Sequence, residues 1–193
     1  MRKTLTFEQN YKGYEIQNTQ EGALIGCLDK SYNLLTKMLV KHSQVLLNGF
    51  CCTYPDDGIK RDYSNQTFLL FLQKFTDHLR HQGYDPKFIW CREHKQGDSK
   101  PHWHFTLLLN ANKIRYLENS YASNLWNQTI NAGNNYGCLQ QTDLGGMMRG
   151  MIVKRGDEQG FADAIYKMSY LGKVESKTNI PTDIRRYGSS QLN

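Results

Sequence analysis

Residues 102–109 alternate strictly between two kinds of side chain, and this alternation constrains the fold more than any other feature of the chain. One set is polar and the other is apolar: His102, His104 and Thr106 against Trp103, Phe105, Leu107 and Leu109. Successive side chains of a β-strand point to opposite faces of the sheet. The pattern therefore predicts a strand whose apolar face packs on the core. Its other face presents two imidazoles side by side, as in strand-borne metal sites.

A third metal ligand is expected from the neighbouring strand, which we predict over residues 87–94, joined by a hairpin loop at 95–101. The register decides between Glu93 and His94, since a slip of one residue exchanges the two faces. With Glu93 beside the histidines, Phe88 and Trp90 pack on the core face. With His94 there, both rings would face the site. Because burying large aromatic rings is favourable, we predict Glu93.

Two imidazoles and one carboxylate suit manganese, magnesium or zinc. Coordination positions left open for a phosphate favour an oxygen-preferring ion, so we expect Mg²⁺ or Mn²⁺ as the cofactor.

Two tyrosines and a lysine recur at helical spacing within the helix that we predict over residues 161–177. Tyr166, Tyr170 and Lys173 fall within an arc of roughly 60°. That arc is centred roughly 150° from the apolar stripe of the same helix. A nearby cation favours the phenolate, which could attack a phosphate. Taken alone, the pattern is also typical of a helix with surface tyrosines.

The remaining hydrophobic patterns predict an α+β fold with an antiparallel sheet. Helices are expected over residues 29–47, 66–82 and 114–130, and further strands over 45–54 and 137–142. Nothing divides the chain, so we expect one domain over 1–193, with 1–44 as an N-terminal helical extension.

Bulk properties narrow the possible partners. The net charge of +6 and the isoelectric point near 9.0 favour a phosphate-bearing partner. The five cysteines form no Cys-x-x-Cys pair and are expected to be reduced thiols in a cytoplasm. The first residues lack the apolar segment of a signal peptide, and the longest apolar run, 68–72, is too short to cross a bilayer, so no membrane partner is expected.

The two motifs together resemble those of the HUH endonucleases. The segments His102-Trp103-His104 and Tyr166-x-x-x-Tyr170-x-x-Lys173 carry the resemblance. Residues 88–93, 169–173 and 185–190 narrow it to the inovirus-type (filamentous phage) rolling-circle replication initiation proteins, over residues 45–191. The resemblance implies a central five-stranded antiparallel sheet flanked by helices, related to the RRM-like palm of other nucleic-acid enzymes.

The resemblance also implies roles for individual residues. His102 and His104 would be metal ligands with Glu93 as the third. Tyr170 would be the main nucleophile, because it stands in the Tyr-x-x-Lys segment, and Tyr166 would be the second tyrosine. Lys173 would position the phosphate or the ion.

The function expected on this basis is metal-dependent nicking and joining of single-stranded DNA through a 5′-phosphotyrosine, at a replication origin in the cytoplasm of a bacterial host. No P-loop pattern occurs, so unwinding would need a host helicase. A relaxase, a single-strand transposase and a non-catalytic origin-binding repressor remain alternatives. Phosphate contacts are expected from five basic residues: Lys154, Arg155, Lys177, Arg185 and Arg186.

Overall fold

The computed structural model describes residues 4–59, 63–94, 97–132, 138–142 and 150–191. The helices are α1 (Ile25–Lys41), α2 (Gln66–His81), α3 (Ser120–Thr129) and α4 (Glu158–Ser169), with 3₁₀ turns η1 (Tyr170–Gly172) and η2 (Glu175–Lys177). The longer strands are β5 (Gln44–Cys52), β6 (Lys87–Glu93) and β7 (His102–Asn110). The shorter ones are β1 (Leu5–Thr6), β2 (Asn10–Tyr11), β3 (Tyr14–Glu15), β4 (Ala23–Leu24), β8 (Leu139–Thr142), β9 (Met151–Lys154) and β10 (Tyr187–Ser189).

The described part of the chain forms a main sheet of six antiparallel strands in the order β10-β6-β7-β5-β8, with β9 also paired to β5. β8 and β9 divide one edge of β5 between them: β9 pairs with 44–47 and β8 with 49–52. The sheet is therefore five strands wide at any level, which is the width that the sequence led us to expect. The predicted α+β class is confirmed.

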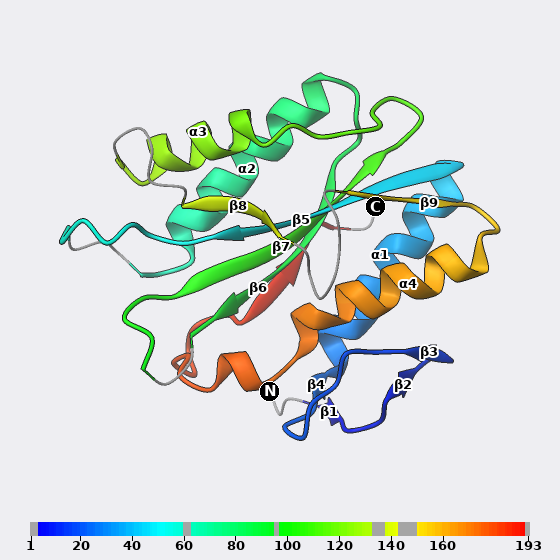
Figure 1. Ribbon diagram of the computed structural model, residues 1–193, viewed down its shortest axis with the longest axis horizontal. Helices are drawn as coiled ribbons and strands as arrows, with labels where there is room; N and C mark the ends of the chain where they lie inside the picture. The colour runs from blue at the N-terminus through cyan, green and yellow to red at the C-terminus, as the bar shows by residue number, and fades with distance from the viewer. Residues whose placement is uncertain (1–3, 60–62, 95–96, 133–137, 143–149, 192–193) are drawn as a thin grey trace.

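Helices cover both faces of this sheet (Figure 1). One core packs α2 and α3 on the face that carries Trp90, Trp103 and Phe105. The other core packs α1 and α4 on the face that carries Cys91 and Leu108. The sequence predicted burial of the aromatic face. It did not predict that the histidine-bearing face is also buried beyond His104, where Thr106 and Leu108 are fully covered.

The first 44 residues are joined to the rest of the fold by α1. Its predicted apolar residues Leu34, Leu35, Met38 and Leu39 are all buried in the α1/α4 core. The helix begins four residues before the predicted start and ends at Lys41 rather than 47, where His42 turns to extended backbone and β5 follows. Four two-residue strands precede α1, and the sequence did not predict them.

The helix predicted over 161–177 is shorter than expected. Asp157 caps α4, because its side chain accepts a hydrogen bond from the Gly160 amide, and the α-helix ends at Ser169. The chain then bends to pair with the segment before α1: Lys173 lies opposite Ala23, and the Val174 amide donates to the Gly22 carbonyl at 3.1 Å. This pairing removes Tyr170 and Lys173 from the helix that carries Tyr166.

Other boundaries differ less. α2 matches the prediction to within one residue. α3 begins at Ser120 instead of 114. β8 begins at Leu139, and residue 137 of the predicted strand lies outside the described residues. Among the described residues, no helix combines the length and the apolar character needed to span a membrane.

Candidate metal centre and nucleophile

The register of β6 against β7 places Glu93 directly opposite His102, and Cys91 opposite His104. Trp90 pairs with Phe105 on the other face, where both rings are buried. This is the register that burial of the aromatic rings predicted, with Glu93 and not His94 beside the histidines.

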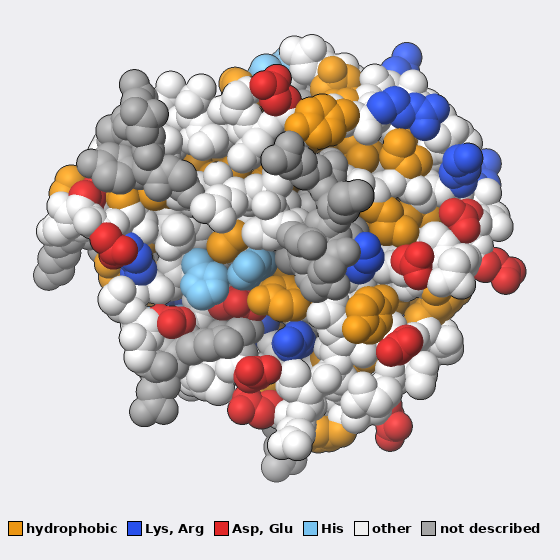
Figure 2. All heavy atoms as spheres, in the orientation of Figure 1, with side chains coloured by type: hydrophobic (Ala, Val, Ile, Leu, Met, Phe, Trp, Pro, Cys, Tyr) orange, Lys and Arg blue, Asp and Glu red, His pale blue; other side chains and the backbone are white. Residues whose placement is uncertain are grey.

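Glu93, His102 and His104 converge on a small volume. Oε2 of Glu93 lies 3.2 Å from Nε2 of His102 and 3.3 Å from Nε2 of His104. The candidate ligand atoms of the three residues all lie within 4.8 Å of one another. Histidine side chains gather on the surface to the left of centre in Figure 2, with acidic atoms beneath them. The site is therefore buried on the carboxylate side and open on the imidazole side.

This arrangement fits a divalent metal ion. At a metal–ligand distance of about 2.1 Å, neighbouring ligands are separated by roughly 3.0 Å in an octahedral site and roughly 3.4 Å in a tetrahedral one. The two separations from Glu93 to the imidazoles, 3.2 and 3.3 Å, lie within that interval. The three side chains could thus hold an ion with little rearrangement.

Glu93 is ionised despite its burial. Burial alone would raise the pKa of its carboxyl, but hydrogen bonds from His102 and His104 and the charge of Lys177 outweigh burial and bring the pKa far below the usual range. A carboxylate that keeps its negative charge is the form that binds a cation.

Tyr170 lies beside this cluster. Its ring is 5.3 Å from the ring of His104, in an edge-to-face arrangement at 70°, and Nζ of Lys173 lies 5.2 Å from the centre of the Tyr170 ring. Burial, followed by the charge of Glu93, raises the pKa of the Tyr170 phenol. Without a further cation, the phenol therefore stays protonated at neutral pH.

Tyr166 is placed differently. It lies on α4, one turn before Tyr170, and its side chain is half-buried. Its backbone carbonyl accepts hydrogen bonds from Gln17 Nε2 and from Ser169 Oγ. In the described structure, it is Tyr170 that contacts the histidines, through His104.

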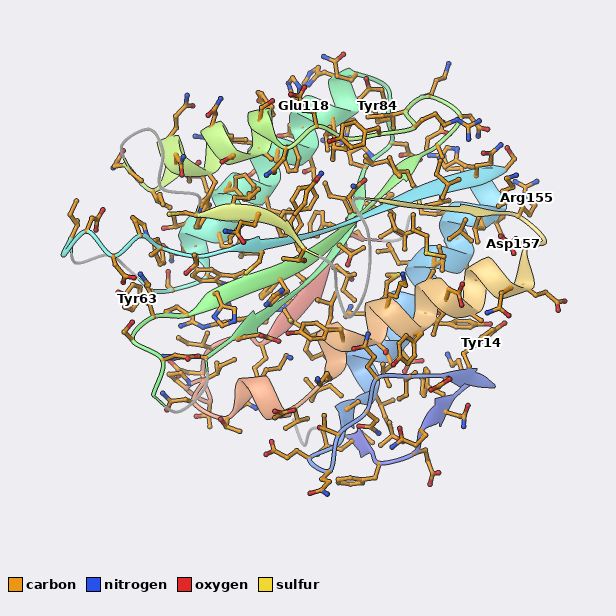
Figure 3. The ribbon with its side chains drawn as sticks, viewed as in Figure 1. Tyr14, Tyr63, Tyr84, Glu118, Arg155 and Asp157 are labelled. Atoms are coloured by element: carbon orange, nitrogen blue, oxygen red, sulfur yellow. The ribbon has the colours of Figure 1, made fainter. Side chains whose placement is uncertain are left out.

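The five basic residues predicted to meet phosphates separate into three groups. Lys154 pairs with Gln44 at one end of β5, whereas Cys51, opposite His104, lies seven residues along the strand, or roughly 23 Å away. Arg155 lies at the end of the molecule away from Tyr63 (Figure 3), and the Tyr63 carbonyl accepts from Arg92, next to Glu93. Lys154 and Arg155 are therefore distant from the metal ligands.

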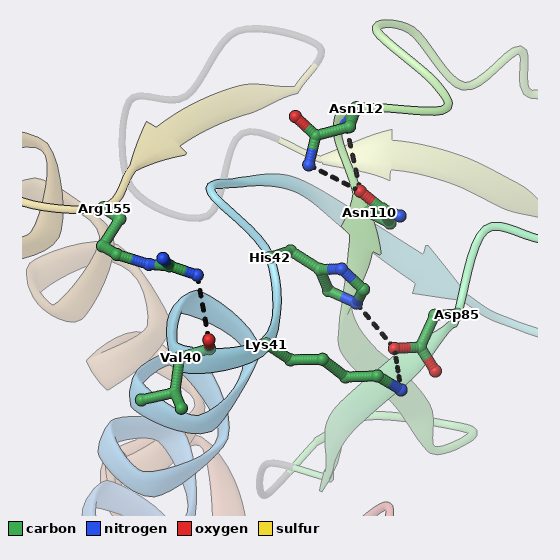
Figure 4. A network of polar contacts seen from close by, with 7 residues as sticks. All are labelled: Val40, Lys41, His42, Asp85, Asn110, Asn112 and Arg155. Carbon is green, nitrogen blue, oxygen red and sulfur yellow. Dashed lines mark hydrogen bonds and ion pairs between the residues drawn. The ribbon is translucent and has the colours of Figure 1, made fainter.

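Arg155 also has a structural contact. Its guanidinium donates to the carbonyls of Leu39 and Val40 at the end of α1, at 2.7 and 2.9 Å (Figure 4 shows the contact with Val40). Cations at this end of a helix stabilise its unpaired carbonyls.

Arg185 and Arg186 lie close to the metal ligands. The Arg186 carbonyl accepts from the Arg92 amide at 2.8 Å, one residue before Glu93. Both arginines also line a cavity of about 260 Å³ with Lys30 and Tyr187. They remain candidates for a DNA strand that leads into the site.

Lys177 does not fit its expected role. Its side chain is fully buried, and its ammonium lies 3.6 Å from Oε1 of Glu93. A surface phosphate could not reach it. No sequence signal distinguished it from the other basic residues of the chain, because its burial depends on how η2 packs against β6.

Together, the sheet and the site define a class of protein: an α+β protein with a candidate His–His–Glu metal centre on adjacent antiparallel strands and a tyrosine next to it. The family model for the replication-associated proteins of the ORF2 type matches residues 50–174, more than half of the chain, and the chain belongs to this family. The matched region contains all three candidate ligands and both tyrosines. Comparison with curated proteins and with solved structures gave no match.

Proposed function

We propose that this protein initiates rolling-circle replication by nicking and rejoining single-stranded DNA at a replication origin, with Tyr170 as the nucleophile. Membership of the replication-associated family supports the biological role. The observation that carries the chemistry is the position of the Tyr170 ring, 5.3 Å from that of His104, a member of the His–His–Glu group.

The proposed reaction is a transesterification. The Tyr170 oxygen forms a bond to the scissile phosphorus while the bond from phosphorus to the 3′ oxygen breaks. The products are a 5′-phosphotyrosine and a free 3′-hydroxyl, and the phenol proton is balanced by the proton that the 3′ oxygen gains. Bond energy is kept in the ester, so the strand can be rejoined without another energy source.

The side chains divide the remaining tasks. Glu93, His102 and His104 would hold Mg²⁺ or Mn²⁺, and the bound ion would supply positive charge against the phosphate oxygens. Lys173, whose ammonium lies 5.2 Å from the Tyr170 ring centre, favours the phenolate and positions the phosphate. Tyr166 would act as the second tyrosine, which accepts the strand when the circle is closed. In this proposal, a host helicase unwinds the duplex in the bacterial cytoplasm.

Replacing Tyr170 with Phe is expected to abolish the covalent adduct while single-stranded DNA binding survives. The substitution removes only the attacking oxygen. The measurement is incubation with a pool of single-stranded DNA and Mn²⁺ or Mg²⁺, followed by a denaturing gel that separates free protein from the DNA-linked form. Chelation of the ion should remove the adduct of the wild-type protein.

Tyr116→Phe is the matched control, because Tyr116 is exposed and lines cavities bounded by α2, α3 and β8, away from the site. Its adduct should equal that of the wild type. Full nicking by Tyr170→Phe would refute the nucleophile assignment. Tight DNA binding without an adduct for any ion would instead support an origin-binding repressor.

A further inference from the structure

Lys177 is a buried cation in the fold. It ends η2, its side chain has an exposed fraction of 0%, and its ammonium contacts two groups of the candidate site. One is Oε1 of Glu93 at 3.6 Å. The other is the carbonyl of Lys173, which accepts a hydrogen bond at 2.5 Å. Burying an ammonium is costly unless it is paired, so such a position requires a compensating anion.

Glu93 is the anion that offsets this charge. The thiols of Cys27 and Cys91 also lie near Lys177, but burial raises the pKa of Cys27 to about 12 and that of Cys91 still further. Both thiols are therefore neutral at physiological pH.

The contacts of Glu93 assign a separate task to each of its oxygens. Oε2 faces the two histidines at 3.2 and 3.3 Å, and Oε1 faces Lys177. A carboxylate held at one oxygen cannot rotate freely about its terminal bond. Lys177 thus keeps Oε2 directed at the space between the imidazoles.

The second contact reaches the nucleophile. The Lys173 amide donates to the Tyr170 carbonyl at 3.2 Å, so Lys173 closes the turn that begins at Tyr170. Lys177 holds the carbonyl of that same Lys173. One ammonium therefore connects a candidate metal ligand with the turn that carries the candidate nucleophile.

We propose that Lys177 is a positioning residue that orients the Glu93 carboxylate towards the metal and fixes the Tyr170–Lys173 turn at a set position relative to it. This inference rests on the proposed function. It assigns Lys177 a role inside the site in place of the phosphate contact that its charge alone indicated. Groups that orient metal ligands from behind typically affect metal affinity or activity by roughly 10- to 100-fold.

The test is Lys177→Met, which keeps the length of the side chain and removes its charge. Binding of Mn²⁺ is measured without DNA, from the electron paramagnetic resonance signal of the free ion. The dissociation constant should rise roughly 10- to 100-fold. Adduct formation at saturating Mn²⁺ should also slow, because the Tyr170 turn loses its anchor, while affinity for single-stranded DNA should stay at the wild-type value.

Lys41→Met is the matched control. Lys41 lies at the exposed end of α1 and pairs with Asp85 at the surface, so the same substitution there should change neither Mn²⁺ binding nor adduct formation. If Lys177→Met does not fold, Lys177→Gln serves for the same measurements, since an amide still donates a hydrogen bond but carries no charge.

A double-mutant cycle in metal-free protein tests the pair itself. Lys177→Met and Glu93→Gln should each lower the melting temperature, and the double variant should lose less than the sum of the two losses. Strictly additive losses would show that the two side chains are not coupled and would overturn the inference.

Two further outcomes separate this inference from the proposed function. Wild-type Mn²⁺ affinity and adduct rate in Lys177→Met overturn the inference alone, as does a loss of DNA binding with metal binding unchanged. Absence of both Mn²⁺ binding and adduct in the wild-type protein overturns the proposed function, and this inference with it.

Discussion

Asp85 connects the end of α1 to the loop before β6. Its Oδ2 accepts hydrogen bonds from Lys41 Nζ and His42 Nε2, each at 2.7 Å (Figure 4). Burial alone would raise the pKa of Asp85, but the hydrogen bonds and charges of Lys41 and His42 outweigh burial and lower it. The backbone of Asp85 is left-handed, with φ at 48°, a conformation that Asn also tolerates.

We therefore expect Asp85→Asn to lower the free energy of unfolding by about 1 kcal/mol at pH 7. Because the folded-state pKa of Asp85 lies below its unfolded value, the carboxylate stabilises the fold above the ordinary aspartate pKa of about 3.9 and stops doing so as the pH falls through the folded-state value. The measurement is urea unfolding of both proteins at pH 7, 5 and 3. A difference that stays constant down to pH 3 would contradict the pairing.

The metal-ligand candidates could be predicted residue by residue, and Lys177 could not. Strand periodicity and the need to bury Phe88 and Trp90 are local properties, and together they select Glu93 over His94. A fully buried lysine is rare, so charge favoured the surface for Lys177. Its true position follows from contacts with Glu93, which lies 84 positions earlier in the chain.

Among the elements, β10 depends on a close approach to β6. Gly188 pairs with Trp90 across the two strands, and a Cβ built on Gly188 would lie 2.8 Å from Nε1 of that indole. The indole is buried among other rings and has little freedom to move. The absence of a side chain at Gly188 is what allows this edge strand to dock.

Gly188→Ala should therefore destabilise the protein by about 1–3 kcal/mol, as overpacking of a rigid core does. Amide hydrogen exchange should accelerate in β10 more than in β5 and β7, because β10 is the strand displaced. Ser189→Ala is the control, since it places the same residue on the same strand without crowding Trp90. Equal exchange rates in wild type and Gly188→Ala would rule out this account of docking.

Element boundaries were predicted well where local patterns decide them and poorly where distant contacts do. α2 is amphipathic along its whole length and matched to within one residue. The predicted helix over 161–177 continued past Ser169 because nothing in its local sequence announces the bridge between Lys173 and Ala23. The four short strands before α1 are two residues each, too brief for any period to register.

At the scale of the whole molecule, the candidate ligands come together only in the folded state. Mn²⁺ should therefore stabilise the folded protein, by about 2.7 kcal/mol at an ion concentration 100 times the dissociation constant. For a chain of this size, that corresponds to a rise in melting temperature of roughly 5–10 °C.

Thermal unfolding followed by circular dichroism with and without Mn²⁺ measures this effect. His104→Ala should lose most of the rise, because it removes one of three ligands from the cluster. A rise of equal size in His104→Ala would place the bound ion elsewhere. The overall α+β class and sheet width were predictable because the strand patterns are local, whereas the division of one edge between β8 and β9 depends on pairing with β5.

The order of the site residues along the chain has a consequence for biosynthesis. Glu93, His102 and His104 lie on one antiparallel pair, β6 and β7, which can form as soon as residues 87–110 have left the ribosome. Tyr170 and Lys177 follow more than 60 residues later. The nascent chain can therefore acquire its metal-binding hairpin well before its nucleophile exists, and no partly made chain can cut DNA.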